Sequence, residues 1–564
     1  MADVFGDLGL RITVSSPIAL ADFSGANLVS NPGFETLDGG APIWDGWTEF
    51  TDSAKAEIVL ETTVVHAGSN SCKILTKDSE GTGHVYQDFT VVPSSIYELS
   101  LWSIVIETLQ STQGRIAIYD VSNSEWIVTM RGTGAFSSVE WLKITEIFRT
   151  PAGCTTVRLY LYQNIYTDKA VYYDDINVQK REIIAPAPIP HWYGAAGISS
   201  YRHTISTTMG FDNMAMNTAG DLATVGQWLE NSLGNHVMVN DMAGRLVWEG
   251  FINDVSAKVG GLTVSVGPIM DVVNRGRIVY ATVNWDTVPP VKGVTVRGEW
   301  QDNIESQEKY GILGGVITGG EGNALEMSQL LSSILAHTSW PETTQNFSLS
   351  SSAEMAVTVS CLGYAHLLSK YYYYETSTAG QENLSTKLAR VLNADPNGMF
   401  SDDNATIEEN TTQVHIYEGD DKTALAIIKE LTAMGDDSYN RYTFGVYENR
   451  TARYDKVESK PTYFQNLETS VTYNRSGAKV YPWDVRSGVW MLMTDFMPGR
   501  SLQVQDQYAD ARPLSTDYYT NFRKDPRYIF IESVTYTAPY AFTVSGGRVS
   551  KFKQRIEKLG LGGI

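Results

Sequence analysis

Between residues 27 and 180 the chain carries a series of short segments in which apolar and polar residues alternate. Such alternation is typical of strands with one buried face, because successive side chains of a strand point to opposite sides. Turn residues separate the segments every 8–12 positions or so, and no segment with helical spacing interrupts them. The pattern predicts an all-β sandwich. Its expected strands are AEIVLET, SCKILT, VYQDFTVV, YELSLWSIVI, RIAIYDV, WLKITEIFRT, TVRLYLYQ and VYYDDINVQ.

The rest of the chain must form further domains, because 564 residues exceed what one hydrophobic core usually serves. Hydrophobic residues make up 43% of the sequence, which is enough to build several cores. The 31 Tyr and 13 Trp residues favour pleated, half-buried surfaces. We therefore predict a mainly β protein with α+β parts.

Charge and cysteine content exclude several classes of protein. The 43 Lys and Arg residues against 64 Asp and Glu give a net charge of −21, and no basic block is available to neutralise DNA phosphates. Tight nucleic-acid binding is therefore not expected. The three cysteines, Cys72, Cys154 and Cys361, lack disulfide or zinc-ligand spacing. The start MADVFGDLGLRITV does not resemble a signal peptide, so we expect synthesis in a reducing cytoplasm and export within a larger assembly.

The segments outside the sandwich predict one unit that the sandwich interrupts. Residues 10–20 read as a strand too short to fold alone, so its partners are expected after His191. Helices are predicted over 222–233 and 323–340, and in STKLARVLN and TALAIIKELTAMG. The predicted organisation is a first hub strand in 1–26, the sandwich in 27–182, a Pro-rich linker in 183–191, a β-barrel and α+β region in 192–376, and a second α+β and β-barrel region in 377–564.

The sandwich section resembles the jelly-roll carbohydrate-binding modules that accompany glycan-degrading enzymes. The resemblance implies a jelly-roll β-sandwich that binds polysaccharide. Four motifs carry it, in the order that the family shows: Asn27-Leu28-Val29-x-Asn31-Pro32-Gly33-Phe34-Glu35, His66-Ala67-Gly68-x-x-Ser71, Val85-Tyr86-Gln87-Asp88-Phe89 and Tyr172-Tyr173-Asp174-Asp175-Ile176.

The same resemblance implies a structural calcium ion. In that family the Glu of the first motif and an Asp of the closing strand help to hold calcium. These roles fall here on Glu35 and on Asp174 or Asp175. Hard carboxylate oxygens suit calcium, and the ion would join the first strand to the last. The alternative is that the three acids only make hydrogen bonds at the surface.

Sugar binding needs flat aromatic faces and a few planar hydrogen-bonding groups. In VRLYLY and in RIAIYD, alternation puts aliphatic side chains on one face and Arg and Tyr side chains on the other. Two tryptophans in loop-like surroundings are expected at the rim of the resulting cleft. The alternative for each residue is packing in the core or on the sheet. The candidate glycan-binding residues are Arg115, Tyr119, Arg158, Tyr160, Tyr162, Trp47 and Trp126.

The remainder of the chain resembles the baseplate-hub and tail-tip proteins of tailed bacteriophages. The matching stretches run in a hub-like order through Ser206–Phe211, Leu246–Ile252, Glu305–Gly311, Cys361–Tyr364, Phe444–Arg450 and Tyr528–Glu532. The resemblance implies β-barrel domains around a homotrimeric ring that joins the tail tube to the tip. It places the protein in the virion after synthesis in the host cytoplasm. The implied partners are tail-tube or distal tail proteins, tip or spike proteins and, through the module, host-surface polysaccharide.

No catalytic motif is evident, and we expect that the protein is not an enzyme. The sequence lacks G-x-S-x-G, H-E-x-x-H and G-x-x-x-x-G-K-[ST]. Cys361 and His366 lie five residues apart, but a buried strand end turning into a helix explains them better than a nucleophile and its base. The alternatives are a secreted glycoside hydrolase with an appended module and a non-enzymatic glycan-binding spike. Paired carboxylates of a hydrolase stay open, since any two of 64 acids could meet in space.

Overall fold

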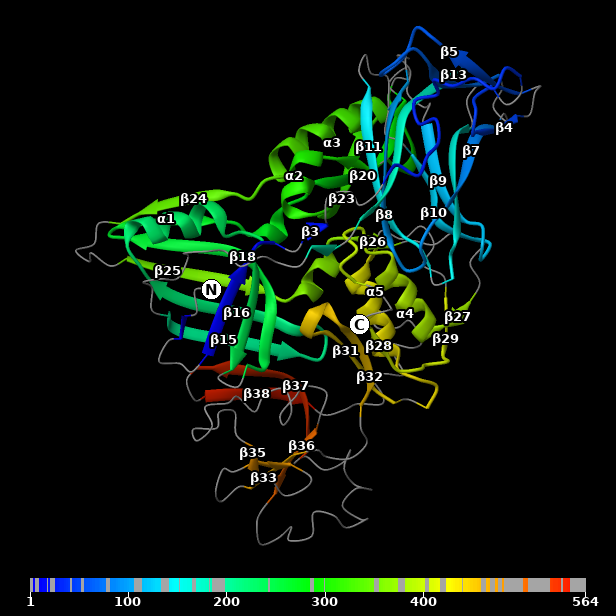
Figure 1. The fold of residues 1–564 in the computed structure, drawn as a ribbon. Coiled ribbons are helices and arrows are strands. Elements are labelled where there is room, and N and C mark those ends of the chain that lie inside the picture. The colour runs from blue at the N-terminus through cyan, green and yellow to red at the C-terminus, as the bar shows by residue number, and fades with distance from the viewer. Residues whose placement is uncertain are drawn as a thin grey trace.

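The chain folds mainly into strands, with helices on parts of the sheets (Figure 1). This arrangement, seen in a computed structural model, confirms the predicted mainly β class with α+β parts. None of the helices that the structure describes is long and apolar enough to span a membrane. The described residues are 4–5, 10–17, 19–20, 26–40, 43–51, 55–77, 82–105, 114–132, 141–151, 153–164, 169–181, 183–184, 198–241, 244–284, 289–298, 300–348, 355–373, 381–400, 405–415, 422–438, 440–457, 463–466, 472–474, 479–480, 501–505, 528–538 and 541–547.

The module between residues 27 and 181 is a sandwich of two five-stranded antiparallel sheets, as the alternation predicted. Side chains from both sheets fill one core, and the hydroxyl of Tyr173 crosses it to donate a 2.9 Å hydrogen bond to the carbonyl of Tyr162. One sheet has the order β10 (Glu125–Gly132), β9 (Gly114–Asp120), β12 (Thr156–Asn164), β7 (Thr82–Thr90) and β4 (Thr48–Thr51). The other has the order β11 (Leu142–Arg149), β8 (Ile96–Ile104), β13 (Lys169–Arg181), β6 (Ser71–Thr76) and β5 (Ala56–Glu61).

The chain enters and leaves the module through a paired stalk. Strand β3 (Ala19–Leu20) is antiparallel to β14 (Ile183–Ile184), so the two connections run side by side. Before the stalk, β2 (Leu10–Ser15) pairs with β17 (His236–Asp241) along its whole length. The pairing predicted for the N-terminal strand is confirmed. The predicted Pro-rich spacer instead begins as a strand at Ile183, and residues 185–191 lie outside the described residues.

A large β unit surrounds the N-terminal strand, and its core contains Ile12 and Val14 of β2 (Figure 1). Helix α1 (Leu222–Asn231), which begins at the N-cap Asp221, lays Val225 and Trp228 on this core. The unit also contains β1 (Val4–Phe5), β15 (Ile198–Ser206), β16 (Gly210–Ala219), β18 (Leu246–Val259), β19 (Leu262–Val266), β24 (Thr343–Phe347), β25 (Met355–Leu362), β37 (Tyr528–Thr537) and β38 (Ala541–Gly547).

A smaller α+β unit lies between this β unit and the module. Helix α3 (Ala324–Thr338) starts with a capping box formed by Asn323 and Glu326, and packs Leu331 and Leu335 on the sheet. Because Gly276 lies under these leucines, a Cβ there would lie 2.9 Å from both side chains. The other elements are η1 (Ile269–Asp271), β20 (Arg275–Asn284), β21 (Val291–Arg297), β22 (Gln301–Asp302), α2 (Ile304–Tyr310) and β23 (Gly314–Gly322).

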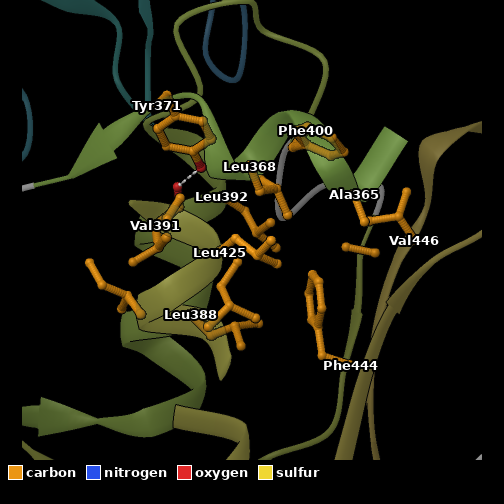
Figure 2. Close-up of a cluster of buried hydrophobic side chains, with 14 of the residues drawn as sticks. Ala365, Leu368, Tyr371, Leu388, Val391, Leu392, Phe400, Leu425, Phe444 and Val446 are labelled. Atoms are coloured by element: carbon orange, nitrogen blue, oxygen red, sulfur yellow. Dashed lines mark hydrogen bonds between the residues drawn. The ribbon is translucent and has the colours of Figure 1, made fainter. Parts of the chain in front are cut away.

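A second core forms around α4 (Leu384–Asn393) and α5 (Ala424–Met434), both of which were predicted (Figure 2). It includes Leu368 as well as Leu388, so the core crosses the boundary that the sequence suggested at residue 376. The remaining elements are η2 (Tyr364–Ser369), β26 (Tyr372–Tyr373), β27 (Glu382–Asn383), β28 (Thr406–Ile407), β29 (Gln413–Val414), β30 (Lys422–Thr423), β31 (Tyr442–Val446), η3 (Glu448–Arg450), β32 (Ala452–Lys456), β33 (Tyr463–Asn466), β34 (Thr472–Asn474), β35 (Lys479–Val480) and β36 (Ser501–Gln505).

The module also contacts the body of the protein away from its stalk. Arg149 of β11 donates a 3.0 Å hydrogen bond to the carbonyl of Gly398. Glu146 of the same strand lies 3.4 Å from Arg275 of β20, and both side chains are nearly buried. A cavity of about 530 Å³ lies between the two parts. The module is therefore docked as well as tethered.

The N-terminal strand should stabilise the body and not the module. We predict that Ile12→Ala lowers the free energy of unfolding of the large β unit by about 2–5 kcal/mol, because a 2% exposed side chain is removed from its core. Differential scanning calorimetry resolves the unfolding transitions, and Ile74→Ala in the module core is the matched control. An Ile12→Ala protein that loses stability only in the module transition would contradict this assignment.

Candidate functional site

A face rich in aromatic side chains covers the outer side of the sheet β10-β9-β12-β7-β4. Its placement follows from alternation in β12: Leu159 and Leu161 are fully buried in the core, so Arg158 and Tyr160 point outward. In β9 the same alternation buries Ile118 and turns Tyr119 outward. We call the following side chains the aromatic face: Phe50, His84, Tyr86, Tyr119, Trp126 and Tyr160.

Strand register brings the members of the aromatic face together. Tyr160 lies opposite Tyr86 in β7, and Tyr119 lies opposite Trp126 in β10. The rings of Tyr86 and Tyr160 are 5.5 Å apart between centroids, and those of Trp126 and Tyr160 are 5.7 Å apart. Further contacts join Tyr119 to Trp126 at 4.8 Å, and Phe50 to His84 at 4.8 Å. The aromatic face is therefore continuous across five strands.

Arg158 is held rigidly in this face. Its Nε and Nη2 donate hydrogen bonds of 2.6 and 2.8 Å to the two carboxylate oxygens of Asp88 on the neighbouring strand. The guanidinium carbon lies 4.2 Å from the ring centroid of Tyr86. The hydrogen bonds to Asp88 raise the pKa of Arg158 further above its usual value. A planar charged group is thus fixed beside two tyrosine rings, with little side-chain freedom left to lose on binding.

His84 is uncharged at neutral pH in this setting. Burial lowers the pKa of its imidazole, and the positive charge of Arg158 lowers it further. Its ring is tilted against Tyr86 and lies edge-on to Tyr160, at 6.0 and 5.4 Å between centroids. His84 therefore adds a neutral hydrogen-bonding ring to the aromatic face.

The predicted residues differ in how accessible they are. Trp126 is 43% exposed at the end of the aromatic face, as expected for a rim residue. Arg115 and Tyr162 are directly opposed in β9 and β12, on the same side of the sheet as the aromatic face. Tyr162 is only 9% exposed, however, so its ring offers little surface to a ligand.

The expectation for Trp47 is wrong. Its side chain is 1% exposed and packs in the module core, where its ring centroid lies 5.0 Å from that of Phe34. The indole N–H donates a 3.1 Å hydrogen bond to the carbonyl of Asn31, so this loop folds inward over the core. The sequence around Trp47 correctly indicates a loop, but a loop that covers the core is not solvent-facing.

Strand β7 contributes to the aromatic face side chains that were not predicted from the sequence. Its outward residues are His84, Tyr86 and Asp88, whereas Val85 and Phe89 enter the core. These residues could have been identified from the sequence, because inward and outward positions alternate in HVYQDF as they do in VRLYLY. Gln87 points inward and binds the N-terminal loop instead, donating hydrogen bonds to the carbonyls of Ser30 and Gly46.

The three acids of the calcium expectation lie together at one end of the module, each accepting hydrogen bonds. Glu35 accepts from the backbone N–H groups of Ser69 and Asn70, at 2.8 and 3.1 Å. Asp174 is buried, accepts from the backbone N–H of His66 at 2.8 Å, and has a pKa raised to about 6, chiefly by burial. Asp175 contacts the His66 imidazole at 2.6 Å.

The structure does not test the calcium expectation, which stays a prediction. In the part of the chain that the structure describes, no three His, Cys, Asp or Glu side chains are grouped so that they could hold a metal ion. The carboxylate oxygens of Glu35 and Asp174 are turned toward backbone N–H groups. Both accept from residues 66–70, so this segment connects the first loop of the module to its last strand.

The Cys361 and His366 pair shows no catalytic arrangement. Cys361 is 1% exposed, and burial raises the pKa of its thiol well above the usual value. His366 lies in η2 and contacts the carboxylate of Asp212 at 2.9 Å. The predicted strand end turning into a helix is confirmed, since β25 ends at Leu362 and η2 begins at Tyr364.

Comparison with known proteins finds one matching family model, described as a carbohydrate binding domain, over residues 26–168. The match covers the module up to strand β13, which is about a quarter of the chain. No curated protein matches. The module is therefore similar to carbohydrate-binding domains.

Solved structures similar to this chain also match over a limited part of it. One is a family 61 carbohydrate-binding module in complex with β-1,4-galactotriose, at 14% identity, 28% of this chain, 99% of that chain and a TM-score of 0.22. The xylan-binding domain of Paenibacillus barcinonensis Xyn10C matches at 14% identity, 28% of this chain, 97% of that chain and 0.21. The tailspike protein 4 enzymatically active domain of bacteriophage CBA120 matches at 13% identity, 28% of this chain, 21% of that chain and 0.22.

Hydrogen bonding by Glu35 and calcium binding by Glu35 predict different effects of a mutation at this residue. We expect Glu35→Ala to lower the melting temperature of the module by several degrees, because it removes the acceptor of two backbone N–H groups. If Glu35 also holds calcium, the loss is larger in calcium than in EDTA, and an equal loss in both would assign Glu35 to the hydrogen bonds alone. Asp38→Ala, at an exposed acid in the same loop region, is the control. A loss seen in calcium but absent in EDTA would instead support the calcium site.

Proposed function

We propose that the aromatic face binds polysaccharide. The observation that carries this proposal is the unbroken series of rings across β10, β9, β12, β7 and β4. Flat rings stack on the apolar faces of sugars, and the series offers several of them side by side. With about 4.8 Å between strands, a ligand touching both Trp126 and Phe50 spans about 19 Å, which favours a chain over a single sugar.

Polar groups among the rings suit the hydroxyl groups of a sugar. The carboxylate of Asp88 accepts hydrogen bonds, the guanidinium of Arg158 donates them, and the hydroxyl groups of Tyr86 and Tyr160 can do both. Arg158 and Asp88 are already fixed by their mutual hydrogen bonds. The face is therefore preorganised. The match of residues 26–168 to a carbohydrate binding domain family supports the same function.

We further propose that the whole chain is a structural, non-enzymatic protein of a phage tail tip or baseplate hub. Two observations support this role: the hub-like succession of motifs after residue 192, and the completion of the β unit by β2 from before the module. The module would hold the tip against host-surface polysaccharide. In a homotrimer three weak sites would act together and raise the overall affinity. The expected protein partners are tail-tube or distal tail proteins and tip or spike proteins.

Two other functions give different results in simple assays. A secreted glycoside hydrolase would release reducing sugar from the polysaccharide that the module binds. A glycan-binding spike would bind polysaccharide but would lie at the outside of the particle, apart from the tail tube.

We predict that Tyr160→Ala and Trp126→Ala each weaken polysaccharide binding at least tenfold, which is about 1.4 kcal/mol, because each removes one stacking ring from a continuous face. Isothermal titration of the intact protein with bacterial surface polysaccharides measures the effect. Trp102→Ala is the matched control, since Trp102 is a partly exposed tryptophan on the outer face of the other sheet. Unchanged polysaccharide binding by both aromatic-face variants would contradict the proposed site.

For the tail-tip role, we expect gold-labelled antibody against this chain to mark the tail tip of purified particles in electron microscopy. The three-copy assembly predicts a mass three times 62.3 kDa by light scattering. Label absent from the tail, or found only in the culture medium, would contradict the virion role while leaving the glycan-binding proposal intact.

A further inference from the structure

The module has a hydrophobic core of its own and forms a separate lobe at the upper right of Figure 1. Among the described residues, the buried apolar side chains of the module cluster only with one another. The units of the body, in contrast, share a core, since Phe251 of the large β unit, Leu313 of the α+β unit and Leu388 of α4 belong to one cluster. Parts of a chain that no large hydrophobic interface joins are expected to move relative to each other. The module can therefore move as one piece without disrupting these cores.

The stalk connects the two parts of the chain. Strands β3 and β14 contain two residues each and are paired with each other. Of the strands that the structure describes, neither is part of a sheet of the module or of the body. An isolated two-stranded ribbon is only marginally stable, and bending it breaks no hydrogen bond of the larger sheets. The stalk is thus suited to act as a hinge.

Charged groups hold the module against the body at β11. The side chains of Glu146 and Arg275 are only 11% and 13% exposed, and they lie 3.4 Å apart across the docking surface. Within a buried ion pair, the attraction is largely offset by the hydration that both charges lose. This pair therefore fixes the orientation of the docked module more than it stabilises docking.

The docking surface is incompletely packed around Ile147 of β11. This side chain lines two cavities, of about 530 and 200 Å³, and residues of both the module and the body bound each of them. Protein interiors contain few voids larger than a water molecule, because atoms that line a void lose dispersion contacts. Separating the module from the body therefore loses less attraction than separating a close-packed interface would.

The docked position is unfavourable for one acidic side chain of the module. Alternation in β8 turns Glu98 away from the module core and toward the larger cavity, where it pairs with Arg181 of β13. Burial raises the pKa of Glu98, and the like charge of Glu308 on α2 raises it further. Arg181 and Lys143 act in the opposite direction. Undocking would move Glu98 away from Glu308 and into water, while Arg181 stays beside it on the same sheet.

We propose that the module is a hinged arm, which leaves its docked position on the body by bending at the β3–β14 stalk. In the open position the contact of Glu146 with Arg275 is broken, and both cavities open to solvent. The aromatic face keeps its structure in both positions, because its ring contacts lie within one sheet of the module. Only the direction in which this face points from the body changes. The hinge does not depend on whether the aromatic face binds a glycan.

A disulfide across the docking surface tests the hinge in the full chain. A Cβ at Gly398 of the body would lie 3.1 and 3.4 Å from Cγ1 and Cγ2 of Ile96 in the module, so Ile96→Cys with Gly398→Cys allows a cross-link in the docked position. The three native cysteines are buried and do not compete. We expect small-angle X-ray scattering to give a smaller radius of gyration for the oxidised variant than for the same variant after reduction. Wild-type protein, which occupies both positions, should match the reduced variant.

A charge reversal tests the hinge without a cross-link. Glu146→Lys places a second positive charge beside Arg275, so we expect it to favour the open position and to give a larger radius of gyration than wild type. Glu125→Lys, the same change at an exposed acid of β10, is the control and should keep the wild-type value. Circular dichroism checks that each variant is folded.

Equal dimensions of the oxidised and reduced cysteine variant would overturn the hinge, because the module would then stay docked without the cross-link. A Glu146→Lys protein as compact as wild type would also contradict it. So would a cysteine pair that never forms the cross-link, since the docked position would then not be visited. None of these results bears on glycan binding, which the titrations of the aromatic-face variants test separately.

Discussion

The antiparallel pairing of β2 with β17 is the constraint on which the rest of the architecture depends. It places β2 between β1 and β17, in a β unit whose strands other than β1 and β2 all come after residue 197. The segment between them must therefore leave the unit and return to nearly the same point. The β3–β14 pair performs this return by aligning the outgoing and incoming backbones. Insertion at such a point costs little, since closure entropy grows only logarithmically with loop length.

The two sheets of the module have different roles. The hydrogen bond and ion pair that dock the module on the body come from β11, in the sheet β11-β8-β13-β6-β5. The aromatic face lies on the other sheet, so these docking contacts do not involve it. Polar and apolar side chains of both parts line a cavity of about 530 Å³ at this docking surface.

Sequence reasoning succeeded where a local pattern decides the structure. Alternation in β12 predicted which of its residues face outward, and burial of Leu159 and Leu161 confirms it. Helices α3 and α5 were predicted from the sequence of their own segments, and both are present. These features depend on neighbouring residues and need no knowledge of the distant chain.

The failures share a physical cause, which is that long-range packing decides them. Trp47 looked exposed because its segment reads as a loop, yet that loop covers the core and buries the indole. Asp88 was seen only as part of a motif, and its bond to Arg158 depends on the register of two strands 70 residues apart. The core shared by Leu368 and Leu388 likewise spans the boundary predicted at residue 376.

The most direct test of the central claim is fluorine NMR of the full chain labelled with 5-fluorotryptophan. The Trp126 resonance is assigned by its loss in Trp126→Phe, and a polysaccharide that the protein binds is then titrated in. If the aromatic face is the site, the resonance of Trp126 shifts to saturation while those of the buried Trp44 and Trp47 stay in place. An unmoved Trp126 resonance at saturating polysaccharide would show that binding occurs elsewhere and contradict the account.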